Sequence, residues 1–163
     1  MTRPEEFVKY LKTPVSPCCN AAQACVFSKA LVARAASCEL SERTCVGEQD
    51  VVACTSPAAR AKCGTLAALL HDQARSVLRL PPPGRPLIHV HALKLQCSGL
   101  SALQHLMVSA DGDVHRLVTR AQDEHGSLSD LPWPSLVSAI ADWQPRARGP
   151  RQAPGSAATE SAG

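Results

Sequence analysis

The residues with the clearest chemical potential in this chain are its cysteines. There are eight, of which seven lie in one stretch and the eighth, Cys97, stands alone further along. The seven are Cys18, Cys19, Cys25, Cys38, Cys45, Cys54 and Cys63. Thiols at this density either pair as disulfides or bind a metal. The function therefore depends on which of these two chemistries the chain uses.

The N-terminal residues bear on that choice. A secretory signal needs a basic start followed by roughly 7–15 apolar residues, whereas charged side chains interrupt residues 1–14. No apolar run approaches the ~18 residues of a membrane span. We therefore expect a soluble cytoplasmic protein with no membrane partner, and structural disulfides are rare in that compartment. This expectation favours metal binding.

Four of the cysteines have a spacing that suits one site. Intervals of six, eight and eight residues separate Cys38, Cys45, Cys54 and Cys63. A [4Fe–4S] cluster is held by four thiolates and, because it is wide, it accepts long loops between its ligands. A structural zinc ion typically takes ligands from close Cys-x2-4-Cys pairs, and the chain has no Cys-x2-Cys. We predict that these four cysteines bind an iron–sulfur cluster, with zinc as the alternative.

The other cysteines are substitute or additional ligands. Adjacent Cys18 and Cys19 point in diverging directions in an extended chain, so one of the two is expected to be a spectator. Cys25 is expected in the first turns of a helix over 20–37, where its side chain points back towards that pair. Cys97 is more typical of a small buried apolar residue, and a ligand role for it stays open.

Other functions find less support in the sequence. We find no nucleophile elbow, phosphate loop or dinucleotide-binding glycine pattern, and we assign no catalytic residue. Two of the three formal positive charges come from the tail after Pro145, and residues 1–145 carry fourteen basic against thirteen acidic residues, so no basic folded face for nucleic acid is expected. We predict an electron-transfer protein, or an accessory to a larger redox enzyme, that binds a protein partner. The alternative is a zinc-stapled adaptor without catalytic activity.

The elements that must position the thiols are expected to be mainly helical. Hydrophobic residues make up 45% of the chain but aromatic residues only 3%, so the core must use Leu, Val and Ala. Ser56-Pro57 is a strong helix start. Residues 38–54 are expected to be loop with a short extended piece. Apolar residues at helical spacing predict helices over 56–80, 98–107, 113–124 and 134–143.

Residues 87–96 are ambiguous between a helix and a strand. His89 and His91 alternate with Ile88 and Val90, which favours one short strand on which the two histidines would share a face as candidate metal ligands. This strand would be the exception in a mainly helical fold.

The chain also divides chemically, because seven cysteines precede Gly64 and all six histidines follow it. We predict a cysteine-rich cap of loops and helices over 1–64, with a short helix at 3–11, on a helical body over 65–145. The tail over 146–163 has no apolar face and is expected to be disordered.

Overall fold

The structure is a computed structural model that describes residues 23–146. The chain there is mainly helical, as its composition predicts. In order, the elements are α2 (Ser28–Val32), β1 (Ser41–Val46), β2 (Gln49–Cys54), α3 (Pro57–Leu78), α4 (His89–Leu106), α5 (Val114–His125), the short 3-10 helix η3 (Leu128–Asp130) and α6 (Trp133–Asp142). The predicted helix at 3–11, the Cys18–Cys19 pair and the tail beyond Arg146 lie outside the described residues.

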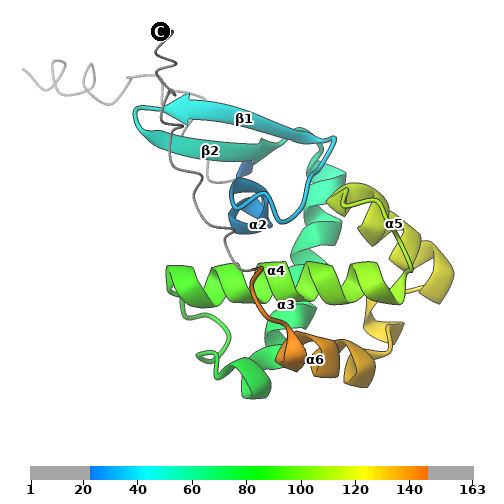
Figure 1. Cartoon of the computed structure of the whole chain (residues 1–163). Coiled ribbons are helices and arrows are strands. Elements are labelled where there is room, and N and C mark those ends of the chain that lie inside the picture. Colours follow the sequence, from blue (N-terminus) through cyan, green and yellow to red (C-terminus); the bar gives the residue numbers. More distant parts are fainter. Residues whose placement is uncertain (1–22, 147–163) are drawn as a thin grey trace, which may run out of the picture.

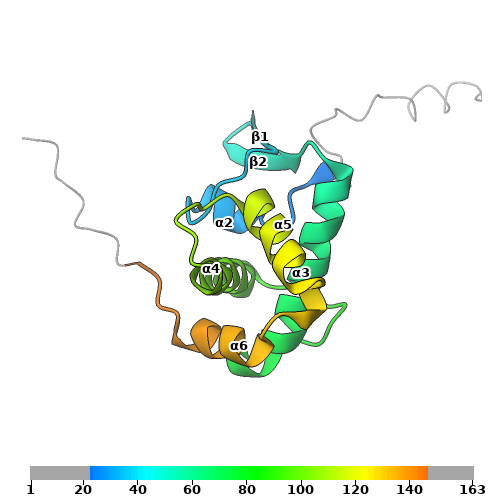
Figure 2. The same ribbon diagram turned by 90° about the vertical axis from the view of Figure 1, so that its right-hand side faces the viewer.

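Helix α4 lies at the centre of the arrangement. In Figure 1 it crosses in front of α3, with the β1–β2 hairpin above and α6 below. Figure 2 views α4 nearly end-on and shows α3, α5 and α6 around it. Helix α4 packs on α2, α3 and α6, and α3 also contacts β2, α5 and α6. Within residues 23–146 no helix is both long and apolar enough to cross a membrane.

Helix α3 begins and ends where the sequence predicts. The Ser56 hydroxyl accepts a hydrogen bond from the Ala59 N–H at 3.2 Å, and Pro57 occupies the first turn, where its missing N–H costs nothing. The helix ends at Arg79, whose backbone is left-handed with φ +53°. The predicted boundary between cap and body, at residue 64, falls inside this continuous helix.

The predicted strand at 87–96 is wrong, because these residues form the loop before α4 and the first half of that helix. Ile88 and Val90 are 63% and 66% exposed, so their alternation with histidines is not a burial pattern. The buried residues Leu95, Gly99 and Leu103 recur every four positions, which is the helical period. The predicted short helix at 98–107 is therefore the second half of one longer helix.

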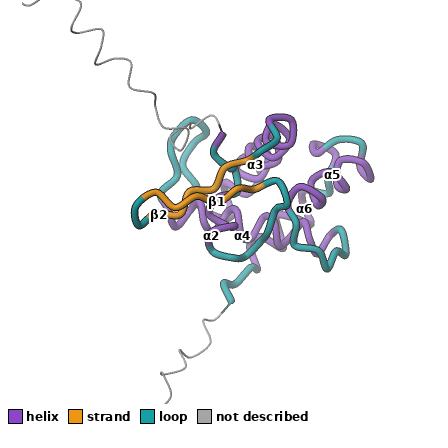
Figure 3. Tube along the Cα trace, turned by 90° about the horizontal axis from the view of Figure 1, so that it is seen from above, coloured by secondary structure: helices purple, strands orange, loops and turns teal. Residues whose placement is uncertain are grey.

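Residues 38–54 are more ordered than the sequence suggested. Strands β1 and β2 form an antiparallel hairpin in which Ser41 pairs with Cys54 and Cys45 with Asp50. Gly47 begins the two-residue turn with φ +64°, a conformation that favours glycine. Figure 3 shows the two strands from above, in front of α2 and α4.

One hydrophobic core joins the two chemical halves of the chain. Phe27 and Leu31 of α2 and Val52 of β2 belong to the same buried cluster as the apolar faces of α3 to α6. A helix was predicted over 20–37. Within the described part of that range, the α-helix α2 covers only Ser28–Val32. This short helix places Cys25 before the helix, beside the hairpin.

Candidate metal centre

Cys54 and Cys63 lie on either side of the start of α3. Cys54 is the last residue of β2, and its Sγ lies 3.3 Å from the Ser56 carbonyl oxygen. Cys63 is in α3, four residues after buried Ala59 and three before buried Leu66. Because residues at these spacings share a helix face, Cys63 lies along the edge of the core, and its side chain is half-buried.

Cys38 reaches the same region through the start of β1. Its carbonyl accepts hydrogen bonds from the Ser41 N–H at 3.1 Å and from the Ser41 hydroxyl at 2.7 Å. Ser41 is the residue that pairs with Cys54 across the hairpin. The tight turn over 38–41 therefore brings Cys38 back next to the end of β2.

Cys25 approaches from the other edge of β2. Its N–H donates to the Val52 carbonyl at 2.9 Å, next to an antiparallel bridge between Ala24 and Ala53. With this register, the side chains of Cys25, Val52 and Cys54 point to the same face. Cys25 and Cys54 are then diagonal cross-strand neighbours, whose Cα atoms lie about 7–8 Å apart.

These four residues, Cys25, Cys38, Cys54 and Cys63, form what we call the four-thiol cluster. Burial, together with the nearby thiols of Cys25, Cys38 and Cys54, raises the pKa of the Cys63 thiol to about 12. Burial also raises the pKa of Cys25 and of Cys38. The thiols of Cys38 and Cys54 contribute to the shift at Cys25, and that of Cys54 contributes to the shift at Cys38. Every member is thus an electrostatic neighbour of the other three, although they come from four separate segments.

Backbone amides are directed at two of these sulfurs. The backbone of Phe27 hydrogen bonds to the Cys25 sulfur and lowers its pKa, which is the effect of an N–H on a thiolate. The backbones of Leu40 and His115 do the same at Cys38. Phe27 and Leu40 each lie two residues after the cysteine they contact. Such amides stabilise the thiolate form, which is the form that binds a metal.

The start of α5 anchors the Cys38 segment. Ser37 forms a parallel bridge with Asp113, with its N–H donating to the Gly112 carbonyl at 3.0 Å and its carbonyl accepting from the Val114 N–H at 2.8 Å. The buried Asp113 carboxylate accepts the Glu39 N–H at 2.6 Å and caps α5 by accepting the Arg116 N–H at 3.0 Å. These bonds connect the residues beside Cys38 to the helical body.

The structure places Cys45 apart from the other three predicted ligands. It lies near the hairpin turn, fully exposed, with its Sγ 3.3 Å from Asp50 Oδ1, and this hydrogen bond raises the pKa of the Cys45 thiol. Cys54 pairs with Ser41, which lies four positions before Cys45 in β1. The Cα atoms of Ser41 and Cys45 are therefore about 14 Å apart along the strand. That distance is too long for Cys45 and Cys54 to bind the same ion.

The remaining candidate ligands do not join the cluster. Cys97 is buried in α4, and its burial raises the pKa of its thiol. His89 and His91 are two residues apart in the same helix, so they point to different sides instead of sharing a strand face. Cys18 and Cys19 lie outside the described residues.

The separate position of Cys45 was not predicted because residues 38–54 were expected to be mostly loop. Gly47 between two stretches of strand formers is a hairpin signal, and a hairpin places Cys45 and Cys54 at opposite ends. The bridge from Ala24 to Ala53 has no comparable sequence signal. In residues 23–146 no three Cys, His, Asp or Glu side chains stand at the short mutual distances that a single bound ion requires.

Comparison with known proteins adds no relative. No family of proteins, no curated protein and no solved structure matches this chain. The functional argument therefore rests on the four-thiol cluster and its surroundings.

Proposed function

We propose that this chain is a metal-binding protein that carries a [4Fe–4S] cluster, in electron transfer or as an accessory to a larger redox system. Its four thiolate ligands would be Cys25, Cys38, Cys54 and Cys63. One observation carries the proposal: the hairpin register, the bridge from Ala24 to Ala53 and the start of α3 bring thiols from four separate segments to one junction. The Cys38, Cys54 and Cys63 ligands are those predicted from spacing, and Cys25 takes the place of Cys45.

The spacing of the cysteines supports an iron–sulfur cluster over a single zinc ion. A structural zinc ion typically takes ligands from close Cys-x2-4-Cys pairs, and no Cys-x2-Cys occurs in this chain. A cubane is wider and accepts long loops between its thiolate ligands.

The surroundings of the thiols suit an anionic metal–thiolate centre. The Phe27, Leu40 and His115 amides are directed at the sulfurs, and the positive charge of Arg60 lies near Cys25. The Arg60 Nε–H donates to the Ala24 carbonyl at 2.8 Å, which fixes this side chain beside the strand that leads to Cys25. When bound, the iron–sulfur cluster would supply one-electron redox chemistry. The chain would hold it at the edge of the core, partly shielded from water.

The proposal is tested by anaerobic purification or reconstitution with iron and sulfide. We expect a brown protein with broad absorption towards the blue and violet, and with iron and acid-labile sulfide in cluster stoichiometry. A colourless protein with stoichiometric zinc would instead support the alternative, a zinc-stapled protein-interaction adaptor. In either case the protein should be handled under reducing conditions, as expected for a cytoplasmic protein.

A matched pair of variants tests the ligand set. Cys25→Ser should lose most of the bound iron, because it removes one of four ligands. Cys45→Ser makes the same chemical change in the neighbouring hairpin and should retain the iron, because Cys45 lies far from Cys54. Retention by Cys25→Ser together with loss by Cys45→Ser would rule out this ligand set.

A further inference from the structure

A groove beside the four-thiol cluster has two arginines on its walls. It has a volume of about 490 Å³ and is lined by Arg34, Ala35, Ala36, Ser37, Arg43 and Gly112. We call it the arginine groove. Ser37 is the residue before Cys38, so the groove begins next to one of the proposed ligands. Its volume lies within the range of ordinary ligand-binding clefts, roughly 300–1,000 Å³.

The two arginines reach the groove from different elements. Arg43 lies opposite buried Val52 in the hairpin, so its side chain points towards α2, where its guanidinium donates to the Leu31 carbonyl at the end of that helix. Arg34 follows the end of α2 and is exposed. One guanidinium is thus held by a hydrogen bond to α2, and the other is exposed.

The charge of the groove has no internal counterpart. Among residues 23–146, no carboxylate lines the groove, and the Arg34 side chain has no hydrogen-bond or ion-pair partner. The hydrogen bond from Arg43 to Leu31 uses only part of its fork of five N–H donors. The groove therefore presents unsatisfied donors and two positive charges to an incoming anion.

The backbone at Arg34 forms the cap that ends α2. Arg34 has φ +57°, its N–H donates to the Leu31 carbonyl at 3.1 Å, and the Ala35 N–H donates to the Ala30 carbonyl at 2.9 Å. These are the two hydrogen bonds of a Schellman cap, in which a left-handed residue ends a helix. The cap fixes the backbone of Arg34 at the edge of the groove.

We propose that the arginine groove docks an acidic segment of a protein partner, whose carboxylates pair with Arg34 and Arg43. This inference rests on the proposed function for the identity of the partner, because a redox partner must bring its own centre close to Cys38. Arginine forks suit carboxylates, since they form two parallel hydrogen bonds. The small side chains of Ala35, Ala36 and Gly112 on the groove leave room for a partner backbone to approach.

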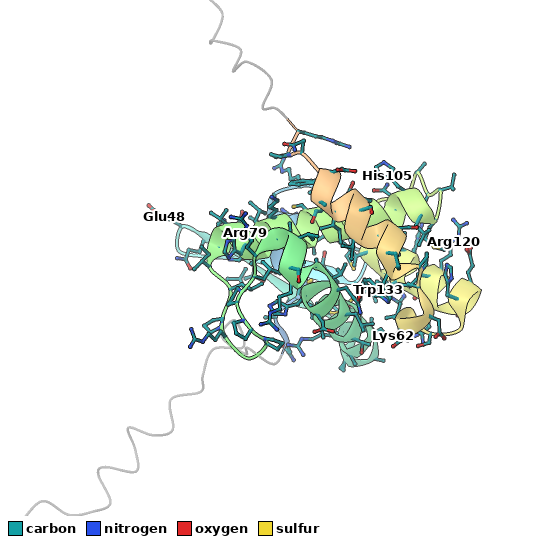
Figure 4. The ribbon with its side chains drawn as sticks, turned by 90° about the horizontal axis from the view of Figure 1, so that it is seen from below. Glu48, Lys62, Arg79, His105, Arg120 and Trp133 are labelled. Carbon is teal, nitrogen blue, oxygen red and sulfur yellow. The ribbon has the colours of Figure 1, made fainter. Side chains whose placement is uncertain are left out.

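The chain contains a matched control for Arg34. Arg79 is also an arginine that follows a helix with a left-handed backbone, φ +53°. It lies at the C-terminal end of α3, whereas the four-thiol cluster lies at the N-terminal end. Figure 4 shows Arg79 and Lys62 at opposite ends of this helix. Arg34→Gly and Arg79→Gly remove the same charge and relieve the same backbone strain, but only the first changes the groove.

The experiment measures binding of a short fluorescein-labelled polyglutamate peptide by fluorescence anisotropy, using the full chain. We expect binding that weakens as salt is added, because the pairs are exposed to solvent. Arg34→Gly should bind about tenfold more weakly, as expected for the loss of one charge-assisted hydrogen-bonded pair, while Arg79→Gly should match the wild type. Thermal unfolding checks that both variants fold.

Three outcomes would overturn the proposal. The first is equal binding by Arg34→Gly and Arg79→Gly. The second is tighter, Arg34-dependent binding of an oligonucleotide of the same charge, which would identify a nucleic-acid partner. The third is Arg34-dependent binding of inorganic phosphate without binding of the peptide.

The proposed cluster and the groove fail separately. Metal content measured on the same samples reports the four-thiol cluster, whereas anisotropy reports the groove. A colourless protein that binds the peptide through Arg34 would refute the iron–sulfur proposal and leave the acidic docking segment standing. A brown protein that does not bind the peptide would refute the acidic docking segment and leave the iron–sulfur proposal standing.

Discussion

The hairpin and the helical body are held together by different interactions. Every residue of β1 after Ser41 whose burial is described is exposed, and among the hairpin residues so described only Val52 is buried. The helices α3 to α6 instead bury a continuous set of apolar side chains against one another. A two-stranded hairpin is marginally stable in water on its own. The body can therefore fold by apolar burial, whereas the hairpin needs further attachments.

The attachments of the hairpin are few and mostly polar. Val52 inserts into the core, the Cys25 N–H pairs with its carbonyl, and Arg43 donates to the Leu31 carbonyl. Exposed polar contacts contribute little stability each. A metal bound by the four-thiol cluster would link the hairpin to α3 through Cys54 and Cys63. On the proposed function, a bound metal would therefore stabilise the hairpin and have little effect on the body.

The largest expected effect is the loss of the hairpin when the metal is removed. After anaerobic chelation, amide hydrogen exchange should become fast in β1 and β2, because ordering this segment costs ~1–2 kcal/mol per residue in backbone entropy with little burial to offset it. Helices α3, beyond Cys63, and α5 should stay protected. Unchanged protection of the hairpin in reductant without metal would show that the thiols are only packing residues.

The second largest effect is expected on the stability of the helical body. Leu70 is 1% exposed, and its two terminal methyl groups lie where a Cβ at Gly99 would come within 2.7 and 2.8 Å of them. Leu70→Ala should lower the free energy of unfolding of the body by ~2–5 kcal/mol through lost burial and a cavity. Urea unfolding of the metal-loaded protein measures it. The exposed Val77→Ala on the same helix is the control and should change little.

The difference between the two regions also explains what could be predicted from the sequence. The helices follow from local signals: Ser56-Pro57 begins α3, Gly126 follows α5, and a proline lies in the first turn of α6. Apolar spacing of three and four residues reports the buried face of a helix directly. Two ranges misled. In 87–96 four alternating residues resemble a strand, while the helical period becomes clear further along, and in 20–37 the helix α2 is shorter than expected.

The candidate site is harder to predict because long-range pairing forms it. Spacing alone grouped Cys45 with Cys54, and the register of the hairpin separates them. The position of Cys25 depends on a bridge to Ala53, and that of Cys38 on a parallel bridge from Ser37 to Asp113. Neither bridge leaves a periodic pattern, so the arrangement of the thiols in space could not be predicted from their spacing in the sequence.

A dependence on pH sharpens the comparison further. The pKa of Cys63 is raised from 9.0 to about 12 in the folded protein, chiefly by burial. A thiol whose pKa is higher in the folded state stabilises the fold below the ordinary value and loses that contribution as the pH rises towards the raised value. The metal-free protein should therefore lose stability between about pH 9 and 12, and Cys63→Ala should flatten this loss. Urea titrations across that range measure it.

A smaller effect is expected where the body holds the Cys38 segment. Asp113→Ala removes the cap of α5 and leaves the Glu39 N–H without its acceptor. Loss of an N-cap costs typically ~1 kcal/mol, within a range of about 0.5–2 kcal/mol. Exchange should also rise at Glu39, beside Cys38. Asp123→Ala removes the same charge from an exposed position of α5 and should affect neither quantity.

The smallest expected effect is at Cys45, the predicted ligand that lies outside the four-thiol cluster. Its side chain is exposed and makes one hydrogen bond, to Asp50 across the hairpin. A serine hydroxyl can replace that donor, so Cys45→Ser should change the free energy of unfolding by no more than about 0.5 kcal/mol. The difference in melting temperature between the metal-loaded and metal-free forms should be the same for Cys45→Ser as for the wild type. A large loss of stability that appears only in the metal-loaded protein would return Cys45 to the ligand set and would mean that the hairpin rearranges when metal binds.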